Sequence, residues 1–274
     1  MAGKMALFVI VPQGACRGRP ASEQEWAATQ VKEHMGMYRI LDWDTDFFGF
    51  RVAFITAPRL DSEELARVLS TLREENVKLV YWPSDSTSRS SQPAAQSLGG
   101  FLADKKTTFF IDFSTIVSTQ FVPAAAVEPY QPSMRISDLE ALGVQSGEYS
   151  RFAVDPRIPR KKFVELYTTW IHNCLKGMLA DAVLVIRDGE SVVGMVTLGS
   201  KGERGEIGLI AVDGNYRGRE YGETLVRSAQ QWFMARGFRY GQVVTQQANV
   251  PACNLYEKCG YSIEKVDFYY HFWL

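Results

Sequence analysis

Apolar side chains recur every three or four positions in three stretches of the chain, a spacing typical of amphipathic helices. These stretches are residues 62–75, 163–174 and 222–236. Gly177 and Gly237 follow the second and the third, at the position where a glycine commonly ends a helix. A short fourth helix is expected near Pro251, because proline is favoured in the first helical turn.

Shorter apolar runs, bounded by turn residues, predict strands between these helices. They are residues 38–41, 52–55, 77–82, 106–114, 182–187, 192–198, 206–212 and 240–245, with a final pair of strands up to Leu274. Asp188-Gly189 separates two of the runs and is typical of a β-hairpin turn. Helices and strands are therefore expected in both halves of the chain, which indicates an α/β (α+β) protein.

The pattern also predicts where the chain divides. Residues 1–36 do not resemble the rest, and we expect a poorly ordered extension or a start site placed too far upstream. A small N-terminal α/β domain is expected over residues 37–118 and a second domain over 134–274. Residues 119–133 contain three prolines and three consecutive alanines, which favours a linker between them.

Composition narrows the class of protein. Hydrophobic residues make up 46% of the chain and charged residues 22%, as in folded globular proteins. A net charge of -1 excludes a general nucleic-acid binder, and no apolar run approaches the roughly 18 residues of a membrane span. We therefore expect a cytoplasmic protein with neither a membrane nor a nucleic-acid partner. The four cysteines and three histidines lack metal-site spacing, so no metal is expected.

A glycine-containing loop joins the strand that ends near Val212 to the third helix. Gly218 and Gly222 allow the backbone to approach a ligand closely. Unpaired N–H groups at the start of a helix, together with the helix dipole, favour a pyrophosphate, and Arg217 and Arg219 add positive charge. Glycines are common at loop-to-helix junctions, so a purely structural role stays open on this feature alone.

Two stretches resemble motifs of the GNAT superfamily of acyltransferases. The loop reads Arg217-Gly218-Arg219-Glu220-Tyr221-Gly222, with Glu220 where the family's acetyl-CoA loop usually has glycine. A second family pattern is matched, in order and at its spacing, by Asn249, Ala252, Leu255, Tyr256, Lys258, Gly260 and Tyr261. The resemblance implies a GNAT fold with a mixed central sheet over residues 134–274, and acetyl-CoA as co-substrate.

The same resemblance implies roles for single residues. Tyr256 would be the acid for the departing CoA thiolate, although a tyrosine packed against the neighbouring strand is the structural alternative. Backbone groups of one strand would bind the pantetheine and polarise the thioester carbonyl. That strand contains Leu209, Ile210, Ala211 and Val212. Asn249 would bind the pantetheine or a water, unless it only caps a helix. The resemblance names no general base, but Glu206, at the start of that strand, could accept the amine proton through water, unless it is an exposed residue at a strand end.

A closer resemblance, over residues 41–49, 146–156 and 245–256, is to the TDP-fucosamine acetyltransferases of bacterial surface-polysaccharide synthesis. It implies a nucleotide-linked 4-amino-4,6-dideoxy sugar as acceptor and a truncated GNAT-like N-terminal domain. Residues that could bind this acceptor are Trp43, Phe47, Phe48, Tyr149, Ser150 and Arg151. The aromatic rings could stack on a base or sugar and Arg151 could bind a pyrophosphate, but core packing and a structural ion pair are alternatives.

The sequence thus predicts an N-acetyltransferase acting on a small-molecule amine, by direct attack of the amine on acetyl-CoA. Two other functions stay open. One is acetylation of a protein or peptide, which needs a groove for an extended chain. The other is a non-catalytic GNAT-like module that binds acyl-CoA or another ligand, the latter if Glu220 has removed its affinity for acetyl-CoA. A homodimer is also left open.

Overall fold

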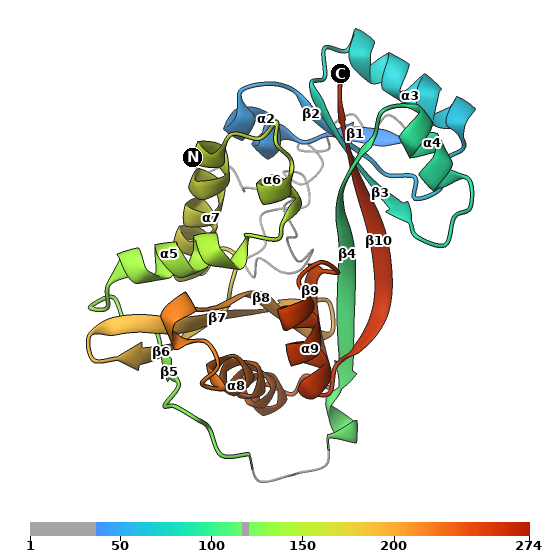
Figure 1. Ribbon diagram of the computed structural model, residues 1–274. Helices are drawn as coiled ribbons and strands as arrows, with labels where there is room; N and C mark the ends of the chain where they lie inside the picture. The colour runs from blue at the N-terminus through green and yellow to red at the C-terminus, as the bar shows by residue number, and fades with distance from the viewer. Residues whose placement is uncertain (1–36, 117–120) are drawn as a thin grey trace, which may run out of the picture. The chain divides into compact units, whose positions relative to one another are not determined.

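The computed structural model describes residues 37–116 and 121–274 (Figure 1). The expected extension at residues 1–36 lies outside this part of the chain. The described residues form two compact units, which we call unit 1 (37–105 and 266–274) and unit 2 (106–116 and 121–265). In neither unit does a described helix have the length and apolar character needed to cross a membrane.

Unit 1 contains a sheet with the strand order β1-β2-β3-β10. Its elements are β1 (Tyr38–Ile40), α2 (Asp42–Phe48), β2 (Val52–Ile55), α3 (Ser62–Glu74), β3 (Leu79–Asp85), α4 (Ser91–Ser97) and residues 267–273 of β10 (Ser262–Trp273). Only β2 and β3 pair in parallel, and the other two pairs are antiparallel.

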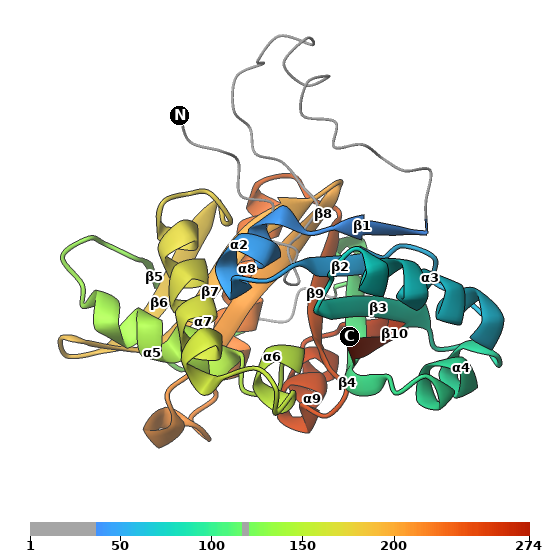
Figure 2. The ribbon, with the colours of Figure 1, turned by 90° about the horizontal axis from the view of Figure 1, so that it is seen from above.

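One face of the unit 1 sheet carries α3 and α4 (Figure 2). The α3 helix begins at a capping box: the Asp61 side chain accepts from the N–H groups of Glu63 and Glu64, and the Glu64 side chain accepts from the Asp61 N–H. Leu65 and Leu72 of α3 are completely buried and belong to a core with Trp82 of β3. The helix expected at residues 62–75 is therefore confirmed.

Unit 2 contains a mixed sheet with the order β4-β9-β8-β7-β6-β5. Its strands are residues 106–112 of β4 (Phe101–Asp112), β5 (Glu128–Pro129), β6 (Ala182–Asp188), β7 (Ser191–Lys201), β8 (Arg204–Val212) and β9 (Tyr240–Gln246). Its helices are α5 (Ile136–Ser146), α6 (Arg151–Val154), α7 (Arg160–Leu175), α8 (Tyr221–Ala235) and α9 (Val250–Lys258). Two short 3₁₀ turns lie at Phe113–Thr115 and Gly214–Tyr216. The expected hairpin is confirmed as the antiparallel pair β6 and β7.

Helices cover both faces of the unit 2 sheet, with α5 and α8 on opposite sides of β7 and β8 (Figure 1). On the α8 side, Leu225 and Phe233 pack with Val196 and Ile207 of the strands. On the other side, α5 runs close to α7. Gly147, just after α5, is necessary there, because a Cβ atom would lie 2.3 Å from the ring of Tyr167.

Strands β4 and β10 are assigned to the units in a way that the sequence does not indicate. Residues 106–112 of β4 pair with β9 in unit 2, although this strand was expected in the N-terminal domain. The expected final strand pair is instead the single strand β10, whose residues 267–273 pair with β3 in unit 1. The division between units therefore lies within β4 and β10 and does not coincide with the expected boundary at residue 118.

Candidate functional site

The parallel strands β8 and β9 separate partway along their length. Their paired residues run from Arg204 opposite Tyr240 to Ile207 opposite Val243, and the pairing ends there. Both strands continue, β8 as far as Val212 and still paired with β7 on its other side. From residue 208 onward, the edge of β8 that faces β9 has no strand partner among the residues that the structure describes. We call this feature the β8–β9 gap.

Successive backbone groups of a strand point to opposite sides, so two hydrogen bonds fix which residues face the gap. The Leu209 N–H donates to Thr197 Oγ1 on β7 at 2.8 Å, and the Asp213 N–H donates to the Val193 carbonyl on β7 at 2.9 Å. Leu209, like Ala211, therefore faces β7. Of the four strand residues expected to bind the pantetheine, only Ile210 and Val212 therefore have backbone groups that face the gap.

Gln145 occupies part of this edge, and sequence reasoning did not identify it. Its side-chain N–H donates to the Val212 carbonyl at 2.6 Å, from the C-terminal part of α5. The partners are 67 residues apart in the chain. No local pattern signals such a contact, because it depends on how α5 packs across β8.

The glycine-containing loop turns sharply into α8. Gly218 has a φ of 76° and Glu220, the residue before the helix, has a φ of 59°. Both values lie in the left-handed region, which glycine adopts without a steric penalty. The Glu220 carbonyl accepts the N–H of Thr224. The N–H groups of residues 221–223 therefore precede the first helical hydrogen bond and are available to an anion.

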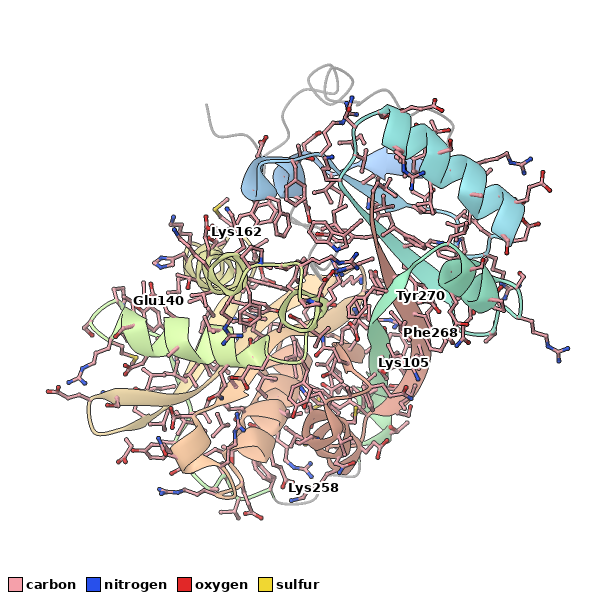
Figure 3. The ribbon with its side chains drawn as sticks, turned by 45° about the horizontal axis from the view of Figure 1, so that its top comes forward. Lys105, Glu140, Lys162, Lys258, Phe268 and Tyr270 are labelled. Atoms are coloured by element: carbon pink, nitrogen blue, oxygen red, sulfur yellow. The ribbon has the colours of Figure 1, made fainter. Side chains whose placement is uncertain are left out.

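Opposite charges surround the start of α8. Glu220 points outward, with 71% of its side chain exposed and Oε1 4.0 Å from Lys258 Nζ. Lys258, labelled in Figure 3, also pairs with Glu223 at 2.5 Å. Arg219 stacks on the ring of Tyr216 at 4.8 Å. Arg217 reaches the Val212 carbonyl at 3.4 Å. The loop thus holds two arginines beside the free N–H groups.

Asn249 has the structural role that the sequence left open. Its side-chain oxygen accepts from the Ala252 N–H at 3.3 Å and caps α9, whose first turn contains Pro251. The cap uses only the oxygen, and the amide nitrogen is not part of it. Binding of the pantetheine by Asn249 stays a prediction.

Tyr256 lies on α9 with only 2% of its surface exposed. Its ring packs against Phe109 of β4, with a centroid distance of 5.5 Å, and against Tyr261 at 6.2 Å. No hydrogen bond between residues that the structure describes engages its hydroxyl. Burial raises the pKa of Tyr256 above its ordinary value, so the phenol stays protonated at neutral pH.

Glu206 is not the exposed strand-end residue that the sequence left as an alternative, because only 4% of its surface is exposed. Its Oε1 accepts from Gln242 Nε2 at 2.6 Å, whereas Oε2 is buried without a hydrogen-bond partner among the described residues. Burial raises the pKa of the Glu206 carboxyl, while Lys201, the Gln242 hydrogen bond and Lys106 act in the opposite direction. A carboxyl with a raised pKa is a stronger base.

Tyr256 and Glu206 project to opposite faces of the sheet. Gly205 faces α8, because a Cβ atom there would lie 2.3 Å from Phe233. Its neighbour Glu206 therefore faces the other side, opposite Gln242 in register. Tyr256 belongs to the core on the α8 side. The structure does not bring the two side chains together on one face.

The residues expected to bind the acceptor belong to different units. Trp43, Phe47 and Phe48 lie on α2 in unit 1, where the rings of Trp43 and Phe47 stack at 4.9 Å. In unit 2, Tyr149 is 41% exposed and adjoins Ser150 and Arg151, which are 1% and 2% exposed. The Arg151 guanidinium stacks on Phe152 at 4.5 Å. Acceptor binding by these six residues stays a prediction.

Comparisons with known proteins agree with this geometry. The model of the acetyltransferase (GNAT) family matches residues 144–261. Spore coat polysaccharide biosynthesis protein SpsD of Bacillus subtilis (strain 168) is 29% identical over 124 residues, which are 45% of this chain and 43% of that protein. The chain thus spans less than half of that relative. A dTDP-fucosamine acetyltransferase of Escherichia coli O6:H1 is 25% identical over 240 residues, 84% of this chain and 95% of that protein.

A solved structure shows the same fold. The GCN5-related N-acetyltransferase from Sphaerobacter thermophilus superposes with a TM-score of 0.59 at 15% identity, over 86% of this chain and 76% of that one. Together with the family match, this confirms the expected fold class, in which helices pack on a mixed sheet.

Proposed function

We propose that residues 144–261, which the model of the acetyltransferase (GNAT) family matches, transfer the acetyl group of acetyl-CoA to an amine. The observation that carries this proposal is the β8–β9 gap, which opens beside the free N–H groups at the start of α8. A strand edge without a partner can bind an extended amide chain, and the pantetheine arm is one. The adjacent helix N-terminus suits a pyrophosphate.

We place acetyl-CoA along these two features. Its pyrophosphate binds the N–H groups of the loop between Arg217 and Gly222, and Arg217 and Arg219 add positive charge. Its pantetheine pairs with the backbone of Ile210 and Val212. One of these N–H groups polarises the thioester carbonyl, as an oxyanion hole does. Leu209 has no part in this, because its N–H is already taken by Thr197.

The proposed reaction is direct attack without an acyl-enzyme. The amine nitrogen bonds to the thioester carbon, the carbon–sulfur bond breaks, and CoA leaves as a thiolate. Glu206 accepts the amine proton through water. Tyr256 donates a hydrogen bond that strengthens as charge grows on sulfur. Complete transfer of its proton is disfavoured, because burial raises the pKa of the phenol still further above that of a thiol.

For the acceptor we propose a nucleotide-linked 4-amino-4,6-dideoxy sugar. The support is the similarity to a dTDP-fucosamine acetyltransferase over 84% of this chain, and to a spore coat polysaccharide biosynthesis protein over 45%. In unit 1 the stacked rings of Trp43 and Phe47 are candidates to bind a base or sugar. In unit 2 the exposed side chain of Tyr149 is a separate candidate, with Ser150 and Arg151 for polar contacts.

The test is a thiol-release assay with acetyl-CoA and a panel of amines that includes TDP-4-amino-4,6-dideoxyhexoses, amino sugars and peptides. We expect turnover on the nucleotide sugar and a loss of roughly a hundredfold or more in kcat for Tyr256→Phe. Tyr261→Phe is the matched control, because it removes a hydroxyl from the same core. The control should retain most of the activity.

Each other result of this assay has a definite meaning. Turnover on peptides but not on amino sugars would replace the sugar by a protein acceptor. Binding of acetyl-CoA without turnover on any amine would overturn the acceptor assignment. Absence of acetyl-CoA binding in calorimetry would favour the non-catalytic module.

A further inference from the structure

A chain of polar contacts links the buried Glu206 carboxyl to the surface of unit 2. Gln242 Nε2 donates to Glu206 Oε1 at 2.6 Å, and Gln242 Oε1 accepts a longer contact of 3.4 Å from Arg204. Arg204 is in turn held by Glu264, through two hydrogen bonds of 2.7 and 2.8 Å. The guanidinium also stacks on the ring of Phe110 at 4.7 Å. Arg204 is therefore fixed from two sides.

The chemistry of the end groups dictates how the Gln242 amide is oriented. An ionised carboxylate can only accept hydrogen bonds and a guanidinium can only donate them. Between Glu206 and Arg204, only one of the two amide orientations satisfies both neighbours. In that orientation the NH₂ group faces the carboxylate and the oxygen faces the arginine. The Arg204–Glu264 pair thereby determines that Gln242 presents a donor to Glu206.

This donor acts on one oxygen of the carboxyl and leaves the other available. Only 4% of the surface of Glu206 is exposed, and its Oε2 has no hydrogen-bond partner among the described residues. A carboxyl with a purely structural role would be expected to use both oxygens, because an unsatisfied buried acceptor costs roughly 1–3 kcal/mol. The unused oxygen indicates a place for a proton or for a water that carries one.

We propose that Gln242 is a positioning residue for Glu206: it holds the carboxylate ionised and oriented, with Oε2 directed to the proton that it accepts, and Arg204 fixes the Gln242 amide. The inference rests on the proposed function, in which Glu206 is the base. The other charged groups that act on Glu206 are Lys201 of β7 and Lys106 of β4. They favour the carboxylate without constraining its direction.

The first experiment compares the pH profile of kcat/KM for wild type, Glu206→Gln and Gln242→Leu. Activity should fall as the pH drops through the pKa of the base. Loss of a charge-assisted hydrogen bond should raise this pKa, and we expect the acid limb of Gln242→Leu to move to higher pH by about one to two units. Arg204→Lys keeps the positive charge but loses the planar guanidinium that holds Gln242. It should therefore move the acid limb in the same direction, but by less.

The matched control is Gln230→Leu. Gln230 is also a buried glutamine, 3% exposed, and donates to the Cys259 carbonyl at 2.7 Å. The same substitution there should lower the melting temperature as much as Gln242→Leu does, but it should leave the acid limb unchanged. If the acid limb of the kcat/KM profile moved in both variants, the shift would follow from lower stability and not from the contact with Glu206, and the proposal would be overturned.

A second readout is independent of turnover. Infrared difference spectra against Glu206→Gln isolate the titration of this one carboxyl. An unchanged titration midpoint in Gln242→Leu overturns the inference about Gln242 and leaves the proposed function intact. Conversely, Glu206→Gln with undiminished kcat and an unchanged acid limb overturns the assignment of Glu206 as base, and with it any catalytic part for Gln242.

Discussion

At the scale of single residues, Glu220 combines an unfavourable backbone with an unfavourable charge. Its φ of 59° is matched, among the non-glycine residues that the structure describes, by Asn76. The left-handed conformation costs a residue with a Cβ atom roughly 1–2 kcal/mol. The Glu220 carboxylate also precedes the N–H groups to which we assign the CoA pyrophosphate. Glycine would remove both penalties, which accounts for the glycine expected there from the GNAT resemblance.

The variant Glu220→Gly should therefore bind acetyl-CoA more tightly, by roughly threefold at low salt, because one repulsive charge is lost. Its free energy of unfolding should rise by up to about 1 kcal/mol. Calorimetric titration at two salt concentrations measures the first effect, and thermal unfolding the second. Asn76→Gly is the control: it changes the same backbone conformation in unit 1, and its acetyl-CoA affinity should not change. Equal affinity of Glu220→Gly and wild type at low salt would contradict the prediction.

Cys174 gives stability a specific dependence on pH. Burial raises the pKa of its thiol to about 12 from an ordinary value near 9. Because the pKa is higher in the folded than in the unfolded state, this contribution is complete below pH 9 and is lost as the pH rises toward 12. We expect the free energy of unfolding to decline across this window, and to decline less in Cys174→Ser, which has no ionising thiol. Chemical denaturation at several alkaline pH values measures the slope. The same slope in both proteins would refute the assignment to Cys174.

At the scale of elements, strand alternation distinguishes neighbouring amides of β8. Leu209 and Ala211 face β7, whereas Ile210 and Val212 face the β8–β9 gap. Amide hydrogen exchange should thus slow at Ile210 and Val212 when acetyl-CoA is added, because new hydrogen bonds protect them. The amides of Leu209 and Ala211 should change much less, which makes them internal controls. Uniform protection of all four would mean that the ligand only rigidifies the strand.

At the scale of the whole molecule, unit 1 uses a strand from the far end of the chain, and unit 2 begins with a strand that precedes the expected linker. Unit 2 needs residues 106–112, because Phe109 and Ile111 are buried in its core and pair with β9. Unit 1 needs residues 267–273, which contribute the buried Tyr270 and Phe272. Cutting the chain at the expected linker would separate both strands from their partners.

We expect a fragment of residues 119–274 to unfold without cooperativity or to aggregate, because it exposes the edge of β9. A fragment of residues 106–265 contains all of unit 2 and should unfold in a single transition. Thermal unfolding followed by circular dichroism compares the cooperativity of the two fragments. The dispersion of amide chemical shifts in NMR spectra shows which of them is folded. The domain boundary expected at residue 118 would be favoured instead if the fragment 119–274 proved the more stable.

Local features were predictable from the sequence because their signals lie within a few residues. The α8 loop and the match around Tyr256 are contiguous, and α9 begins at Val250, beside Pro251. Helix periodicity placed α3 because apolar spacing reflects the face that is buried. The cap formed by Asn249 was foreseen as an alternative for the same reason, since a cap involves residues three positions apart.

Longer-range relations were decided by the tertiary structure alone. The roles of Gln242 and Gln145 depend on partners 36 and 67 residues away, and no local pattern records such a distance. The burial of Glu206 follows from its position in the middle of a sheet, which its neighbours in sequence do not reveal. The sequence alone determined where α3, α7, α8, α9 and most of the strands form, because backbone conformation and periodicity are local. It also predicts which loop would bind a pyrophosphate. Only the fold decided which strands pair, which amides face the gap and which carboxyl is buried, because these depend on packing between distant segments.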